Sequence, residues 1–319
     1  MSESNLQYDP AEIAGRVLAH DMWQEMTAFS KRQQLFDYGA MVCFGIGLPL
    51  LFFGRMSDWG LFCGIGGLIA GAIIFGCKYS FRRKFFREQV VPLLVKAILP
   101  SLKYAPYQGL SRSRFSKLRL FGSFDRYHSE DQLKGVIGQT AIEASEVHIE
   151  KRHRNGKDKS ESYTTIFRGV VFIADFNKHF KCRTVVLPDT AEKLFGKLLG
   201  NFLQQMNFSE DGKLVKLENV EFEKKFAVYS TDQHEARYIL TPLFMERLLA
   251  VQSQEKSPIR VLFEDSNMTI ALSRSGGWLE PPFWRSFDRM EILEKTVQEI
   301  VNIIKLVEAL DLNTRIWTK

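Results

Sequence analysis

Two apolar segments near the start of the chain contain no charged side chain. The first covers residues 38–53, the second covers residues 60–77, and only residues 54–59 lie between them. An apolar segment approaching about 20 residues can cross a bilayer only as a helix, because the backbone must satisfy its own hydrogen bonds there. The alternative is a buried helical hairpin in a soluble core, but helices of that kind usually keep a polar stripe, and neither segment has one. The pattern predicts two membrane-spanning helices.

Small residues and cations refine this hairpin. Gly60 and Gly64, then Gly67 and Gly71, are four residues apart on the second segment. This spacing lets a helix backbone approach closely, so it predicts contact with the first segment and permits self-association. Positive charge lies on one side of the pair, at residues 31–32 and 78–87. Because Lys and Arg stay on the cytoplasmic side, both termini are predicted to be cytoplasmic.

The residues before and after the hairpin carry different patterns. Residues 1–37 are predicted to form an amphipathic N-terminal helix, because Asp9, Pro10 and Glu12 give a helix-start signal. Residues 38–79 form the transmembrane hairpin. Residues 80–125 are predicted to be a basic juxtamembrane helix, bent at Pro92, and a linker. Residues 126–319 are predicted to be a cytoplasmic α+β domain.

Alternating and β-branched residues predict a mainly antiparallel sheet in the last segment. Residues 141–151 and 163–176 form two strands that pair across a polar tip at 153–162, and residues 259–263 and 268–272 form a second hairpin. Further elements are strands at 181–187 and 226–229 and helices at 188–206 and 241–252.

The last long element has the clearest helical period. Six apolar residues step by three and four along one stripe: Met290, Leu293, Val297, Ile300, Ile304 and Val307. Neighbouring apolar residues widen this stripe beyond a two-position seam, which favours burial against the sheet over a coiled coil with a partner. The fold class is therefore α+β, with helices packed on the sheet and a helical hairpin at the N-terminal end.

Composition is that of an ordinary folded protein, with 45% hydrophobic and 25% charged residues. The net charge of +6 is unevenly distributed, because residues 78–126 hold 12 Lys or Arg and two acids, which leaves 31 basic and 35 acidic residues elsewhere. Anionic lipid attracts such a segment. The residues expected to contact the membrane surface are Arg82, Arg83, Lys84 and Arg87. The alternative for this cluster is simple retention of positive charge in the cytoplasm. Nucleic acid is not an expected partner, because no groove-reading or RNA-binding motif accompanies the charge.

Three segments of the second half resemble a known family. They are RYHSEDQLKGVIGQTAIEASEVHIE (126–150), IFRGVVFIADFNKHFKCRTVVLPDT (166–190) and VYSTDQHEARYILTPLFMERLL (228–249). They are similar to the bacterial domain of unknown function family 3137, over roughly residues 80–315. The resemblance implies a two-span protein of the bacterial inner membrane with a cytoplasmic α+β domain. It also implies a small helical membrane protein of the LemA type as a partner, and it supplies no catalytic residues.

The residues themselves give little catalytic signal. Neither an H-E-x-x-H motif, a C-x-x-C motif nor a phosphate-binding loop occurs, so no metal, cofactor or catalytic residue is predicted. Cys182 is the single cysteine outside the apolar segments and their ends, so it cannot form a disulfide framework or a thiolate metal site. A solvated turn is the favoured interpretation of residues 128–131, and Asp232 is read as a helix cap.

One speculative ligand pocket can be assembled from dispersed polar residues. Its members are Asp175, His179, Arg183, His234 and Arg237. A turn between strands is the favoured alternative for the first of them. The sequence thus predicts a membrane-anchored binding or scaffold domain that recognises a partner protein or small ligand. The alternative is a membrane-tethered enzyme acting on an anionic substrate, if the five residues converge.

Overall fold

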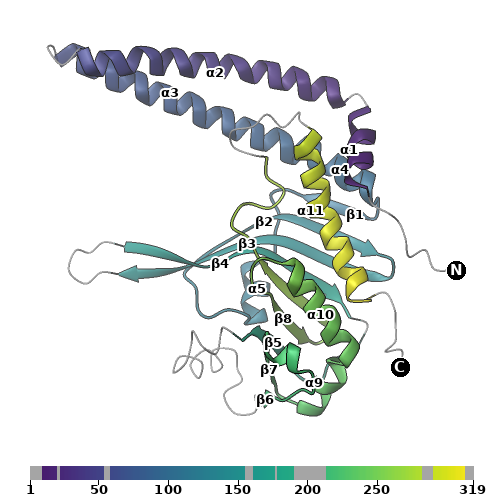
Figure 1. The fold of residues 1–319 in the computed structure, drawn as a ribbon. Coiled ribbons are helices and arrows are strands. Elements are labelled where there is room, and N and C mark those ends of the chain that lie inside the picture. The colour runs from purple at the N-terminus through teal and green to yellow at the C-terminus, as the bar shows by residue number, and fades with distance from the viewer. Residues whose placement is uncertain are drawn as a thin grey trace. The chain divides into compact units, whose positions relative to one another are not determined.

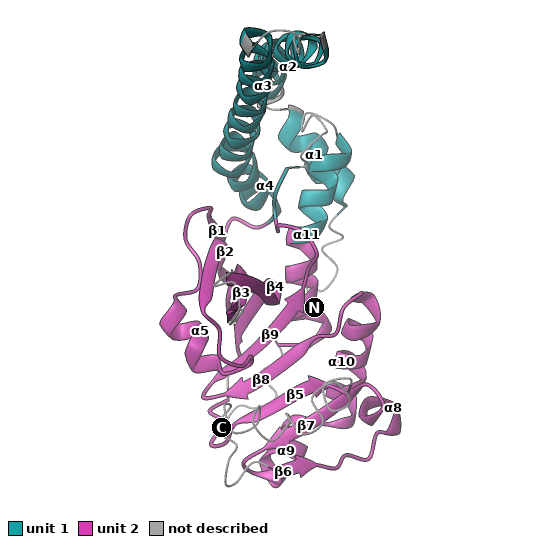
Figure 2. Ribbon diagram, turned by 90° about the vertical axis from the view of Figure 1, so that its left-hand side faces the viewer, with its two compact units in different colours: residues 1–98, 279–299 teal, residues 99–278, 300–319 magenta. Residues whose placement is uncertain are grey.

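The computed structural model describes the chain in seven stretches: residues 9–19, 22–53, 58–154, 161–176, 178–189, 213–281 and 290–312 (Figure 1). It divides into two compact units. Unit 1 comprises residues 1–98 and 279–299, and unit 2 comprises residues 99–278 and 300–319 (Figure 2). Unit 1 is helical, and unit 2 contains the sheet. The predicted α+β fold class is confirmed.

Unit 1 begins with α1 (Pro10–Ala19), whose start is the predicted one. The backbone N–H of Ala11 donates to Asp9 Oδ1 at 3.0 Å. The next helix, α2 (Met22–Phe53), starts well before the first apolar segment, so residues 22–37 continue directly into it. Residues 20–21, where the predicted N-terminal helix would join the two, lie outside the described residues.

Glycines set the contact between α2 and α3 (Asp58–Phe85). A Cβ added at Gly67 would lie 3.1 Å from the Cα of Gly47, and one at Gly64 would lie 2.8 Å from the backbone nitrogen of Leu51. The two backbones therefore touch where side chains would separate them. The predicted contact between the two apolar segments is found, and both helices are long and apolar enough to cross a membrane.

A π-helical turn follows α3. It is η2 (Phe86–Val90), and α4 (Val91–Ile98) continues from it. Pro92 has no N–H to donate, and its ring displaces the carbonyl four residues earlier, so the regular α pattern cannot pass through this position. The Val91 N–H instead reaches back to the carbonyl of Phe86. The structure therefore interrupts the regular α pattern just before Pro92, and a bend of the helix at Pro92 remains a prediction.

Unit 2 is built on nine strands in one antiparallel sheet, with the order β1-β2-β3-β4-β9-β8-β5-β7-β6 among the described residues. The strands are β1 (Leu102–Ala105), β2 (Arg126–Ile137), β3 (Thr140–Arg154), β4 (Glu161–Asp175), β5 (Thr184–Pro188), β6 (Lys213–Val215), β7 (Phe226–Ser230), β8 (Arg260–Glu264) and β9 (Asn267–Ser273). Both predicted hairpins, β3 with β4 and β8 with β9, pair as expected.

Helices lie on both faces of this sheet. The helices of unit 2 are α5 (Arg112–Leu118), α8 (Val220–Glu223), α9 (Gln233–Ile239), α10 (Pro242–Gln254) and residues 300–309 of α11 (Met290–Ala309). Figure 2 shows α5 on one side of the strands and α10 on the other. On the α5 side, Phe115 and Phe121 join a core with Val147 and Phe167. On the other side, the rings of Phe244 on α10 and Phe263 on β8 meet at 5.8 Å between centroids.

Helix α11 contributes residues 290–299 to unit 1 and residues 300–309 to unit 2. Five of the six residues in its predicted stripe are fully buried: Leu293, Val297, Ile300, Ile304 and Val307. These five residues are therefore buried within the chain and do not form a free coiled-coil seam, whereas packing of the stripe against the sheet remains a prediction.

Several elements differ from the sequence predictions. Strands β1 and β6 and helices α5 and α8 were not predicted, and β1 and α5 lie in the segment predicted to be helix and linker. Pro188 ends β5 and does not begin a helix, while residues 190–206 of that predicted helix lie outside the described residues. Arms of the β3–β4 hairpin extend into the predicted tip, as Arg154 pairs with Glu161.

Candidate functional site

Two of the five residues of the speculative pocket lie at the turn between β8 and β9. Asp175 is the last residue of β4 and stands opposite Asn267 in the ladder. The Nδ1 atom of His179 lies 3.4 Å from the hydroxyl oxygen of Ser266. The side chain of His179 is exposed, so this position is open to a ligand.

Arg183 reaches the same turn but is engaged there. Its Nη1 atom lies 2.7 Å from Glu264 Oε1, and its Nη2 donates to the carbonyl of Leu118. Burial lowers the pKa of Arg183, and the neighbouring carboxylate of Glu264 opposes that change. The positive charge is thus balanced inside the protein, and little of it remains for an anionic ligand.

The other two residues, His234 and Arg237, lie on α9. Asp232 caps this helix as predicted, because Asp232 Oδ1 accepts from the N–H of His234 at 2.8 Å. Arg237 Nε donates to the carbonyl of Lys216 at 3.3 Å. The structure therefore brings Asp175, His179 and Arg183 to one turn and holds the last two on a separate element. Ligand binding by the five residues remains a prediction.

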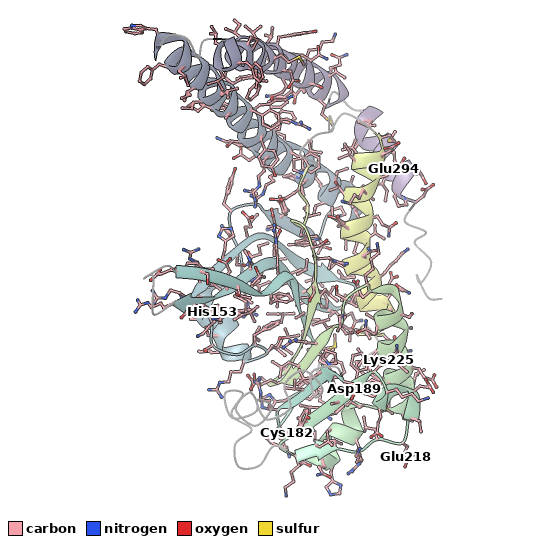
Figure 3. All side chains as sticks on the ribbon, turned by 60° about the vertical axis from the view of Figure 1, so that its left-hand side comes forward. His153, Cys182, Asp189, Glu218, Lys225 and Glu294 are labelled. Carbon is pink, nitrogen blue, oxygen red and sulfur yellow. The ribbon has the colours of Figure 1, made fainter. Side chains whose placement is uncertain are left out.

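Glu235 ties α9 to the segment before β5. Its carboxylate accepts the backbone N–H groups of Lys181 and Cys182, the latter at 2.8 Å. Partial burial acts to raise the pKa of Glu235, but hydrogen bonds from the thiol and backbone of Cys182 and from the backbone of Lys181 outweigh it, so the pKa is lowered. Figure 3 shows the position of Cys182 beside the strands. Burial raises the pKa of this thiol, which keeps it protonated and unreactive.

A second group of polar side chains was not predicted. Glu130 and Asp131 on β2 and Glu146 on β3 each place a carboxylate oxygen within 4.8 Å of the other two. We call these three residues the carboxylate cluster. Asp131 is 0% exposed and Glu146 is 5% exposed. Carboxylates are almost never buried to this degree without partners, so the cluster is the most unusual polar arrangement among the described residues of unit 2.

An irregularity in β2 creates the cluster. The register between β2 and β3 shifts between Glu130 and Leu133, so the ladder contains a bulge there. Asp131 adopts a φ of +57°, which Asp tolerates better than most residues. Its N–H donates to the carbonyl of Pro106 at 3.1 Å, and the Tyr104 hydroxyl donates to its Oδ1. The bulge turns the side chain of Asp131 inward, whereas regular alternation along β2 would expose it.

Neighbouring groups compensate part of the negative charge. Arg168 Nε lies 3.5 Å from Glu146 Oε1, and the backbone N–H of Trp278 donates to Glu146 Oε2 at 2.7 Å. His128 Nε2 lies 3.5 Å from Glu130 Oε2. Three ionised carboxylates this close repel one another, and a bound cation would lower their energy. Their oxygen atoms are the ligand type that Mg²⁺, Ca²⁺ and Mn²⁺ prefer.

The interpretation of residues 128–131 as a solvated turn is wrong, since they lie within β2 and Asp131 is buried. The inserted residue of the bulge is the physical reason, because it breaks the alternation from which exposure is inferred. One signal was present in the sequence. Glu146 lies in a run of small and apolar residues, where a carboxylate needs partners.

The four cations expected at the membrane surface have different environments. Arg82 and Arg87 are 6% and 1% exposed, and Arg83 Nη2 lies 2.5 Å from Glu280 Oε1. Lys84 is exposed. Contact of these residues with lipid remains a prediction, and Lys84 is the member best placed for it.

Comparison with known proteins gives one family. Residues 165–312 match the family described as protein of unknown function (DUF3137). Among solved structures, the chain is similar to the crystal structure of the mycobacterial trehalose monomycolate transport factor A, TtfA. The match has 10% sequence identity and a TM-score of 0.33, and it covers 72% of this chain and 95% of that chain. A likeness at this score carries no functional conclusion. No curated protein matches the chain.

Proposed function

We propose, on the match of residues 165–312 to the DUF3137 family of proteins of unknown function, that this chain is a membrane-anchored binding or scaffold protein. In this proposal, α2 and α3 cross the bacterial inner membrane, and unit 2 faces the cytoplasm. Unit 2 there recognises a partner protein or a small ligand. Candidate partners are a helical membrane protein of the LemA type and a second copy of the chain.

The exposed apolar surface of α2 and α3 carries the anchoring part of the proposal. Phe52 is 83% exposed and Phe62 is 72% exposed, and Met41, Ile46 and Ile73 are also more than half exposed. Burying one such side chain is worth about 1.5–3 kcal/mol, so water is an unfavourable surrounding for so many of them. A bilayer removes this surface from water without any change in the helices.

Charge supports the orientation. Lys31 and Arg32 precede the apolar part of α2, and the cations of residues 78–87 follow that of α3. Cations near the ends of spanning helices are retained on the cytoplasmic side. Both ends of the hairpin then face the cytoplasm, and the ends of α2 and α3 at Phe53 and Asp58 face the other compartment.

The β3–β4 hairpin supports the binding part. Its outer arms, residues 151–154 and 161–164, pair only with each other among the described residues, and they extend beyond the rest of the sheet (Figure 1). Arg126 stacks on Tyr163 there, with its guanidinium carbon 3.2 Å from the ring centroid. The sheet edges β1 and β6 are short, which disfavours strand addition by a partner. The projecting hairpin is therefore the favoured contact surface.

The enzyme alternative has weaker support. Asp175, His179 and Arg183 gather at the β8–β9 turn, but the guanidinium of Arg183 is paired with Glu264. An anionic substrate would have to compete with that carboxylate. A binding role needs no such rearrangement.

Membrane fractionation tests the anchor. The full chain should sediment with membranes and resist extraction at alkaline pH, which releases peripheral proteins. With the native cysteines replaced by Ala, a cysteine at Trp59 should react with an impermeant thiol reagent added outside spheroplasts, and one at the exposed Lys134 should not. Recovery of the intact chain in the soluble fraction would contradict the proposal.

Photo-crosslinking tests the binding surface. His153 and Glu218, both labelled in Figure 3, are exposed positions on different parts of unit 2. A photoreactive residue at 153 should trap a protein in native membranes, whereas one at 218 should not. Reversing the charge of Arg152 and Arg154 should remove the adduct at 153. Equal adducts at both positions would show non-specific proximity and oppose the proposed surface.

A further inference from the structure

Strand β4 extends beyond the strand beside it. Its residues 169–175 pair with β9, whereas its residues 161–168 pair with β3 alone among the described residues. The last backbone bond on the β9 side runs from the N–H of Arg274 to the carbonyl of Arg168 at 2.9 Å. Residues 161–167 therefore form a sheet edge within the part of the chain that the structure describes, and this edge lies on the projecting hairpin (Figure 1). We call these residues the β4 edge.

The β4 edge lacks the features that usually protect an exposed edge. Natural edge strands are very short, or they carry lysine, proline or an inward-pointing charge. Residues 162–167 read SYTTIF, with no charge and no proline, and most of them favour strands. Ser162, Thr164, Thr165 and Ile166 are exposed. The edge is therefore suited to pairing with a further strand.

The other arm of the same hairpin is protected. Residues 151–154 of β3 read KRHR, so three of the four side chains are cationic. The N–H of Arg152 donates to Asp125 Oδ2 at 2.8 Å, and Lys151 Nζ lies 3.4 Å from the same oxygen. Charge and a side-chain acceptor thus occupy this edge. The difference between the two arms indicates that β4 is the arm that can gain a strand.

The hairpin already holds the β4 edge in the shape that pairing needs. A bulge interrupts the ladder beside Phe167, and beyond it residues 161–165 pair in regular register with residues 150–154. The Oε1 atom of Glu161 lies 3.4 Å from nitrogen atoms of both Arg152 and Arg154 across the two arms. A strand that is ordered before it meets its partner loses less conformational entropy on binding.

We propose that the β4 edge pairs with the β4 edge of a second copy of this chain, antiparallel across a two-fold axis, so that two sheets join into one. The inference rests on the proposed function, in which the hairpin is the contact surface and a second copy is a candidate partner. Two-fold pairing sets each residue i opposite a residue j of the copy, with i + j constant. It uses both edges, so assembly ends at a dimer.

The sequence of the edge favours a second copy as the occupant. A partner has to offer an uncharged open strand of matching length, and the β4 edge is itself such a strand. An axis at Thr164 sets Thr164 opposite its copy and Tyr163 opposite Thr165, which are favourable cross-strand pairs. No charged residue then faces a like charge. Antiparallel pairing also points the cationic arms, residues 151–154, in opposite directions, whereas parallel pairing would place them side by side.

Cysteine crosslinking of the full chain in native membranes tests this pairing. With the native cysteines replaced by Ala, single cysteines are placed in turn at residues 162–166 and oxidised. Like residues on the axis lie within reach of a disulfide, and each step away from it separates them by about 7 Å along the strands. A single position, expected at Thr164, should therefore give a dimer of the chain. Differently tagged chains with cysteines at 163 and 165 should crosslink to each other.

A charge added to the edge gives a second, independent test. Thr164→Lys supplies the protection that the β4 edge lacks and sets like charges across the axis, so it should weaken the dimer about fivefold. Leu214→Lys adds the same charge at an exposed position of β6, the outermost strand of the same sheet, and should leave the dimer unchanged. Energy transfer between donor- and acceptor-labelled full chains in detergent measures both affinities.

The outcomes distinguish this inference from the proposed function. Crosslinks without a constant i + j, equal losses in the two Lys variants, oligomers larger than a dimer, or capture at 164 of a different protein alone would overturn the strand pairing. The proposed function would survive these results if the chain still sediments with membranes and a photoreactive residue at 153 still traps a partner. Failure of those two experiments would overturn the proposed function, even where the dimer is found.

Discussion

Individual carboxylates set the electrostatics of unit 2. Those of Glu235 and Glu264 accept hydrogen bonds or pair with an arginine, and their charges are used within the fold. Those of the carboxylate cluster crowd one another around a bulge. A carboxylate is therefore stabilising at Glu235 and Glu264 and a source of repulsion in the carboxylate cluster. Substitutions that remove its charge should have different effects on stability in the two places.

Asp131→Asn should leave the free energy of unfolding of unit 2 unchanged or raise it in buffer containing a chelator. The amide keeps the shape, tolerates the positive φ and still accepts from Tyr104, while one of three repelling charges is removed. Asp131→Val should lower that free energy by about 2 kcal/mol or more, through backbone strain and the lost acceptor. Denaturant titration of the full chain in detergent, followed by tryptophan fluorescence, measures both. Equal losses in the two variants would show that the charge itself is required.

Glu235→Gln should remove a pH-dependent part of stability. Because the folded pKa of Glu235 lies below its ordinary value of 4.5, the ionised form stabilises the fold above that value and the contribution is lost as the pH falls through the folded pKa. The stability difference between wild type and variant should therefore be constant near neutral pH and shrink below about pH 4.5. Unfolding midpoints measured from pH 7 to pH 3 test this. A difference that grew on acidification would contradict the assigned direction.

Secondary structure elements differ in how clearly the sequence encodes them. The β3–β4 and β8–β9 hairpins and α11 were predicted because their patterns persist over many residues. Strands β1 and β6 have four and three residues, too few for any period, and they exist because a neighbouring strand offers a ladder. In β2 the bulge interrupts alternation at Asp131.

The candidate site was predictable to a lesser extent than the fold. The cap at Asp232 is local and was found, whereas the carboxylate cluster depends on Tyr104 and Trp278, which come from distant parts of the chain. Three residues of the speculative pocket meet at one turn because β4 pairs with β9 and β5 pairs with β8. Local sequence patterns do not predict which distant strands pair, so this arrangement could not be predicted.

Gly67→Ala should loosen the α2–α3 hairpin, while the adjacent Gly66→Ala should not. A Cβ at Gly67 would meet the backbone of Gly47 at 3.1 Å, but a Cβ at Gly66 meets nothing within 4 Å. Overpacking at such a contact costs about 1–3 kcal/mol, and alanine at an open helical position gains up to about 1 kcal/mol over glycine. Thermal unfolding in detergent, with a cysteine pair placed across the helices as a crosslinking reporter, should separate the two variants. Indistinguishable crosslinking would show that the glycine contact does not hold the hairpin.

The whole molecule consists of two units that differ in the exposure of their large apolar residues. Unit 2 buries its large residues on both faces of the sheet, whereas α2 and α3 of unit 1 expose theirs. Stability of the sheet and attachment to the membrane should therefore respond to different substitutions.

Phe172→Ala tests this separation. Phe172 lies on β4, an interior strand of the sheet, and is fully buried, so the substitution should lower the stability of unit 2 by about 3–5 kcal/mol. Resistance of the chain to alkaline extraction should stay as in the wild type, because the helices are unchanged. Protease sensitivity of residues 126–278 in membrane preparations measures the first effect, and fractionation measures the second. Loss of membrane attachment in this variant would show that the two properties are coupled.

The π turn η2 also determines whether the chain can tolerate a one-residue deletion at this position. A π turn holds one residue more than the α-helix it interrupts, and each residue advances a helix by about 100°. Deleting any one of the five would restore a continuous α pitch and would rotate all that follows by that amount. The buried stripe of α4, made of Val91, Leu94, Val95 and Ile98, would then point in another direction. The extra residue thus sets the rotation of α4 relative to α3. One continuous helix can therefore expose its apolar side chains in α3 and bury those of α4.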